Sequence, residues 1–182
     1  AAAELDVDWM RYLAILMDQD DRQFKNVDGV IRIVPTSVDD DSYLSEMRRA
    51  QNAFSSHRSL SQMPLETRQV VAGFGESLGR FGRMAGAGYF KQAINNGAKS
   101  LSESLDMIPE RDAITDDEYI AATERALRIR GVGLACWTRL LAMKRPDRFL
   151  CVNSANSDRI HEIFGSTPGT AGDYLRLMQQ IW

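Results

Sequence analysis

Apolar residues recur at helical spacing along most of the chain, and this pattern predicts an all-α, or mostly α-helical, protein. The first predicted helix spans 7–19, and its apolar face consists of Trp9, Leu13, Leu16 and Met17. Further helices are predicted over 39–54, 64–78, 89–96 and 100–108. The one extended run lies near residues 30–34 and ends at Pro35, so we expect at most a vestigial β element there.

The second half of the chain predicts two longer helices. A Thr-x-x-Glu capping box at 115–118 opens a helix that continues to about residue 130. The next helix is predicted over 134–144, where apolar residues recur at three- and four-residue steps. Trp137 belongs to this apolar face, so we expect it in the core rather than under a stacked base.

The sequence Gly131-Val132-Gly133 separates these two helices. Two glycines around one small apolar residue permit a hairpin too tight for side chains at the glycines, with Val132 pointing inward. Main-chain amides of the turn and of the following helix, starting at Leu134, then point outward at the positive end of a helix dipole. Such amides form a ready phosphate site.

Charge is distributed unevenly along the 182 residues. The net charge of −3 argues against a protein wholly coated by nucleic acid. Residues 1–50 carry 11 Asp and Glu against 6 Lys and Arg, whereas residues 124–148 carry 7 Lys and Arg against 2 acids. The positive charge therefore coincides with the glycine turn. The residues predicted to bind DNA are Arg130, Gly131, Val132, Gly133, Leu134, Arg139, Lys144 and Arg145.

Six glycines crowd residues 73–88, a spacing that is costly inside a helix. One interpretation is close approach of the main chain to a ligand, with Arg80 and Arg83 on phosphate. The other is close helix packing or an irregular loop. Neither a preceding strand nor a following Gly-Lys-Ser/Thr supports a nucleotide-phosphate loop.

Other features limit the class of protein. No apolar run approaches the ~20 residues of a membrane-spanning helix. Cys136 and Cys151 lack metal-site spacing, so we expect reduced, buried thiols in a cytoplasmic protein without zinc or cofactor. The chain lacks an initiator Met and ends at Trp182, so we expect a trimmed piece of a larger protein, truncated at its C-terminus.

The stretch "IRGVGLACWTRLLA" resembles the hairpin of helix-hairpin-helix DNA-binding proteins. The continuation "KRPDRFLCVNSANSDRIHEIFG" resembles the segment after the hairpin in the base-excision DNA glycosylase superfamily, which includes the 8-oxoguanine glycosylase fold. The match covers about 118–165. The resemblance implies a two-lobed helical fold that grips duplex DNA between its lobes, with residues 1–109 as the N-terminal lobe and 110–182 as the helix-hairpin-helix lobe. It also implies a monovalent cation at the carbonyls of Arg130 and Val132, and a flipped target nucleotide.

The chain departs from that family at the residues that carry the chemistry. Asn153 stands at the position of the catalytic Asp, and a neutral amide cannot supply the negative charge. Ala135 stands where bifunctional members carry a lysine, so a Schiff-base mechanism has no nucleophile there. Asp147 and Asp158 are nearby carboxylates, and of these Asp147 is kept as a second catalytic candidate beside Asn153. Alternatively, Asn153 or Ser154 only caps the helix that follows.

Three hypotheses about function remain open. In the first, the protein is a DNA-binding module that holds DNA or senses a modified or flipped base, as part of a larger nuclease or defence protein. In the second, it is an active monofunctional DNA N-glycosylase of base-excision repair. In the third, it is a helical protein-interaction domain whose hairpin is only a corner of the core.

Overall fold

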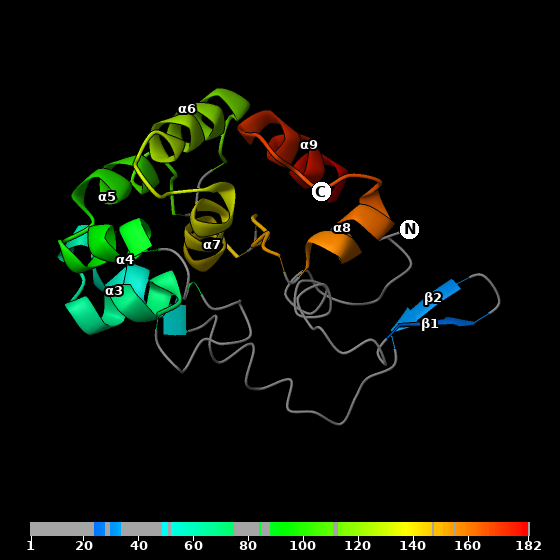
Figure 1. The fold of residues 1–182 in the computed structure, drawn as a ribbon, viewed down its shortest axis with the longest axis horizontal. Coiled ribbons are helices and arrows are strands. Elements are labelled where there is room, and N and C mark those ends of the chain that lie inside the picture. The colour runs from blue at the N-terminus through cyan, green and yellow to red at the C-terminus, as the bar shows by residue number, and fades with distance from the viewer. Residues whose placement is uncertain are drawn as a thin grey trace.

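The protein is mostly α-helical, as the apolar pattern predicts (Figure 1). The computed structural model describes residues 24–27, 30–33, 49–50, 52–74, 84, 88–110, 113–146, 148–154 and 156–181. The helix predicted over 7–19 lies outside these residues, as do all but Gly73, Phe74, Met84 and Gly88 of the glycine-rich stretch.

Two short strands form an antiparallel hairpin. Strand β1 (Phe24–Val27) pairs with β2 (Val30–Ile33), with Phe24 opposite Ile33. Strand β2 corresponds to the β element expected near residues 30–34. Its partner β1 was not predicted, because its sequence Phe-Lys-Asn-Val carries little apolar alternation.

The other regular elements of the described chain are helices. Residues 49–50 and 52–56 are helical, and a 3-10 turn, η3 (Leu60–Gln62), follows them. The longer helices are α3 (Leu65–Ala72), α4 (Gly88–Asn95), α5 (Lys99–Leu105), α6 (Asp116–Leu127), α7 (Leu134–Lys144), α8 (Ser157–Phe164) and α9 (Ala171–Ile181). Helix α3 is shorter than predicted because Gly73 adopts a left-handed conformation, φ 91°, which ends the helix.

The capping box predicted at the start of α6 is confirmed. The Glu118 amide donates to the Thr115 hydroxyl, and the Thr115 amide donates to the Glu118 carboxylate at 2.9 Å. Helix α9 was not predicted, although it carries a related signal. There the Thr170 amide donates to the Asp173 carboxylate at 3.0 Å, and the Asp173 amide donates to the Thr170 hydroxyl at 3.1 Å. A shorter acid thus takes the place of the glutamate.

Helix α7 lies at the centre of the helical assembly, with α3, α4 and α5 on one side and α8 and α9 on the other (Figure 1). Every residue from Cys136 to Lys144 is buried, so α7 has protein on all sides along most of its length. Trp137 is in the core, as predicted, and its indole N–H donates to the Thr123 hydroxyl of α6 at 2.9 Å.

One continuous apolar core joins the helices before and after residue 109. Around α6 and α9 it contains three stacked rings, those of Tyr119, Phe149 and Tyr174. The Tyr174 hydroxyl donates to the Leu150 carbonyl at 2.6 Å, which satisfies its polar end. The division into lobes at 109/110 therefore does not coincide with a break in this core, and a two-lobed arrangement stays a prediction.

The buried hydrogen bond between α6 and α7 gives a stability test. Trp137→Phe is expected to lower the free energy of unfolding by about 2 kcal/mol, because it removes ring volume and the indole donor to the Thr123 hydroxyl. Urea denaturation measures the change. Thr123→Val removes the same bond, so the double variant should lose clearly less than the sum of the single losses. Additive losses would contradict this assignment.

Candidate nucleic-acid interface

The predicted glycine hairpin is a tight turn between α6 and α7. The Val132 amide donates to the Ile129 carbonyl at 3.0 Å, which closes the turn. Val132 is buried, as predicted, whereas Gly131 and Gly133 on either side of it are exposed. The turn thus presents main chain at the surface and is held by one apolar side chain underneath.

Both the backbone conformation and the lack of space around it require glycine at position 131. Its φ of 80° lies in the left-handed region that favours glycine. A Cβ atom there would overlap the Cβ of Tyr89 and lie 3.2 Å from the amide nitrogen of Phe90. The turn therefore rests directly on the first residues of α4.

Gly133 differs from Gly131 in both respects. Its φ of −94° and ψ of 175° are accessible to any residue, and a Cβ atom there would meet nothing within 4 Å. Gly133 is the N-cap of α7 and has no side chain to accept from the first helical amides. Among the described residues, the amides of Leu134 and Ala135 have no acceptor, while the Gly133 amide donates to the Cys136 sulfur. The start of α7 therefore offers N–H donors at an open surface.

Arg130 is the exposed cation next to this surface. Its guanidinium carbon lies 3.8 Å from the ring centroid of Tyr89, and the guanidinium also donates to the Tyr89 hydroxyl. Within the part of the chain that the structure describes, no carboxylate lies within ion-pair distance of Arg130. Arg128, by contrast, lies 3.7 Å from Glu124 one turn earlier on α6.

The prediction that Arg139, Lys144 and Arg145 contact DNA is wrong, because all three side chains are buried. Arg139 is 0% exposed, and its Nε donates to the Val71 carbonyl at 3.0 Å. Lys144 donates through Nζ to the Leu105 carbonyl at 2.9 Å. Arg145 donates to the Pro109 carbonyl at 2.8 Å. None of these cations is available to an external phosphate.

The physical reason is that helix C-termini leave carbonyls without intrahelical partners. Val71 lies in the last turn of α3 and Leu105 is the last residue of α5, so Arg139 and Lys144 satisfy carbonyls at the negative ends of two helix dipoles. Gly73 is part of this packing, since a Cβ atom there would lie 2.7 Å from the Nε of Arg139. Burial lowers the pKa of Lys144, and the nearby Asp106 carboxylate opposes that shift.

The segment before α8 is anchored to α7 and to itself. The Thr138 hydroxyl accepts from the Val152 amide at 3.0 Å. The buried Asn156 donates to the Cys151 carbonyl at 2.7 Å and accepts from the Asn153 amide at 2.9 Å. Asn156 is thus the residue that shapes this turn, and the sequence pattern alone did not single it out.

Asn153, the residue at the predicted pocket position, is half-buried, and its side-chain amide lies 3.7 Å from the Cys151 sulfur as a donor. The N-cap of α8 is Asn156, so the prediction that Asn153 or Ser154 caps this helix is wrong. Asp158 lies exposed in the first turn of α8, where a helix favours an acid. Asp147 lies outside the described residues.

The two cysteines are buried thiols, as predicted. Burial raises the pKa of both Cys136 and Cys151, which keeps them protonated at neutral pH and disfavours a nucleophilic role. In the described chain, no group of three or more His, Cys, Asp or Glu side chains is arranged to hold a metal ion. The monovalent cation at the carbonyls of Arg130 and Val132 stays a prediction.

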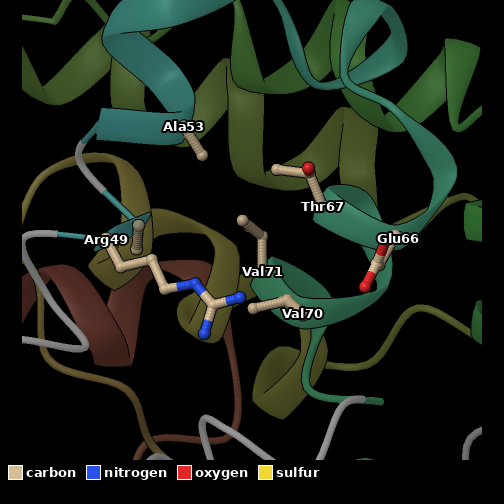
Figure 2. A pocket seen from close by; sticks show the side chains of 7 residues that line it. Arg49, Ala53, Glu66, Thr67, Val70 and Val71 are labelled. Atoms are coloured by element: carbon tan, nitrogen blue, oxygen red, sulfur yellow. The ribbon is translucent and has the colours of Figure 1, made fainter.

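A small pocket lies elsewhere, between the helical residues 49–50 and 52–56 and helix α3 (Figure 2). Its volume of ≈ 210 Å³ is below the roughly 300–1,000 Å³ of typical ligand pockets. Arg49 and Glu66 flank a lining of Ala53, Thr67 and Val70 (Figure 2). None of the residues predicted for DNA binding or catalysis lines it.

No protein-family model, curated protein or solved structure matches this chain. The likeness to helix-hairpin-helix proteins accordingly stays a prediction carried by residues 118–165. Among the described helices, none combines the length and the apolar character that crossing a membrane requires.

The two glycines of the turn provide a matched stability test. Gly131→Ala is expected to lower the free energy of unfolding by about 2 kcal/mol, because alanine disfavours the positive φ and overlaps Tyr89. Gly133→Ala should change it by less than about 0.5 kcal/mol, since its backbone is extended and its surroundings are open. Thermal and urea unfolding measure both. Equal losses in the two variants would refute the distinction between the glycines.

Arg139→Ala tests whether Arg139 stabilises the core, as its burial indicates, or only contacts phosphate at the surface. Its loss is expected to lower the free energy of unfolding by about 3 kcal/mol, because a cavity forms and the Val71 carbonyl loses its donor. Chemical denaturation measures this change. A variant with unchanged stability would contradict the core role of Arg139.

Proposed function

We propose that the protein is a DNA-binding module that grips a backbone phosphate at the α6–α7 turn and holds DNA without excising a base. The observation that carries the proposal is the uncapped start of α7 at the exposed Gly133. The amides of Leu134 and Ala135 there lack an acceptor among the described residues, and the space above Gly133 is open.

A phosphate suits this surface for two physical reasons. Unpaired N–H groups at a helix N-terminus combine donors with the positive end of the dipole, so they favour an anion. A glycine at the N-cap lets that anion approach the main chain without a side chain in the way. Arg130 adds a full positive charge beside the turn that no described carboxylate neutralises.

The chemistry near Asn153 favours holding over cutting. The family's excision mechanism relies on a carboxylate at this position, and Asn153 is neutral and directs its amide toward the Cys151 sulfur. Ala135, in the first turn of α7, offers no amine for a covalent intermediate. These residues support the DNA-holding module over the N-glycosylase.

The proposal also sets the expected salt dependence. The exposed cations next to the turn are few, because Arg139, Lys144 and Arg145 are buried. Each neutralised phosphate contributes about 0.9 to the slope of log K against log salt concentration. We therefore expect detectable binding to a plain duplex at low salt, with a shallow slope.

Gly133→Asp is the decisive variant, because its effects on stability and binding have opposite signs. Aspartate is a favoured N-cap, so the variant should be at least as stable as the wild type. Its carboxylate would occupy the α7 amides and repel phosphate, so duplex binding should fall by at least about ten-fold. Fluorescence anisotropy with a labelled duplex measures binding, and urea unfolding measures stability.

Gly133→Asn and Gly133→Ala are the matched controls. Asparagine caps the helix as aspartate does but adds no charge, so it should weaken binding less than Gly133→Asp. Alanine should weaken it least. If the wild-type protein does not bind a duplex at low salt, or if Gly133→Asp binds as the wild type does, the proposal fails and the protein-interaction hypothesis is favoured.

A further inference from the structure

The aromatic residue under the turn suggests that the interface extends beyond α6 and α7. We infer that Tyr89 on α4 is a positioning residue that holds Arg130 beside the α6–α7 turn, where the guanidinium contacts a second phosphate of the same DNA. This inference rests on the proposed function and adds α4 to its binding surface.

The turn and α4 are fixed to each other at one point. Phe90 is buried in the core and fixes the start of α4, while the neighbouring Tyr89 remains 48% exposed. Gly131 lies against the main chain of both residues, so the turn cannot shift without moving α4. Arg130 directly precedes Gly131, which brings its side chain onto the exposed face of the Tyr89 ring at 3.8 Å.

This contact orients Arg130 without neutralising it. A cation on an aromatic face is attracted by the electrons of the ring but keeps its charge, unlike a cation paired with a carboxylate. The Tyr89 hydroxyl accepts one of the five guanidinium N–H groups, which leaves further donors for an oxygen ligand. Neighbouring arginines differ, since Arg125 pairs with Glu103 and Arg128 lies near Glu124.

An unrestrained arginine must lose side-chain freedom when it binds phosphate, and this loss weakens binding. Stacking on Tyr89 fixes the guanidinium before DNA arrives. Removing the ring should therefore weaken binding through Arg130 and not independently of it. That dependence separates a positioning residue from a second, separate contact.

Duplex anisotropy across several salt concentrations tests the inference. Arg130→Ala should weaken binding about ten-fold at low salt and reduce the salt slope by about 0.9. Tyr89→Leu should weaken binding about five-fold, and Tyr89→Phe, which keeps the ring, should weaken it less. The Tyr89→Leu/Arg130→Ala double variant should bind no more weakly than Arg130→Ala alone. Arg128→Ala is the matched control and should lose less than Arg130→Ala.

A second measurement needs no DNA. In the wild-type protein the NMR signal of the Arg130 Nε–H group should show the ring-current shift of a stacked guanidinium, which Tyr89→Phe retains and Tyr89→Leu abolishes. Circular dichroism checks that each variant is folded.

The outcomes separate the inference from the proposed function. If the wild type binds a duplex and Gly133→Asp abolishes binding, but Tyr89→Leu binds as the wild type does, the inference alone is overturned. Losses that add in the double variant overturn it as well, because Tyr89 would then act independently of Arg130. A wild-type protein that binds no duplex overturns both.

Discussion

The described fold depends on buried cations that satisfy the carbonyls at helix C-termini. Arg139 and Lys144, on the central helix α7, donate to main-chain oxygens in the last turn of α3 and at the end of α5. A charged group inside a protein is tolerated only where such partners compensate for lost hydration. Here the charged groups also offset the negative ends of two helix dipoles, so a single helix fixes the ends of two others.

The same arrangement explains which parts of the fold the sequence could predict. The limits of α7 and the capping box of α6 follow from local rules, because spacing and capping involve residues a few positions apart. The role of Arg139 does not, since its acceptor is 68 residues away. A cluster of basic residues in sequence therefore suggested a DNA surface, although three of the four cations predicted to bind DNA are buried and only Arg130 is exposed. The start of α9 was missed because a Thr-x-x-Asp pair is a weaker signal than Thr-x-x-Glu.

The sequence likewise predicted the local features of the candidate interface but not its long-range contacts. The Gly-Val-Gly spacing correctly indicated an inward Val132 and a turn of exposed main chain. It could not indicate that glycine is required at position 131 but not at position 133. Only the position of α4 shows that a side chain at Gly131 would collide with a neighbour, whereas one at Gly133 would not. The sequence likewise did not indicate a role for Tyr89, since it lies 41 residues before the arginine that it contacts. An aromatic residue beside a buried Phe in a short helix resembles ordinary core in sequence.

The bonds from α7 to main-chain carbonyls also affect how such a fold can evolve. Every residue type has a carbonyl, so the residues now present as Val71, Leu105 and Pro109 can be replaced without loss of the acceptor. The donors have no such freedom, because few side chains are long enough and positively charged. Selection on these contacts therefore acts on one partner only. Related sequences would keep Arg139, Lys144 and Arg145 while their partner positions drift, and paired substitutions would not reveal the contacts.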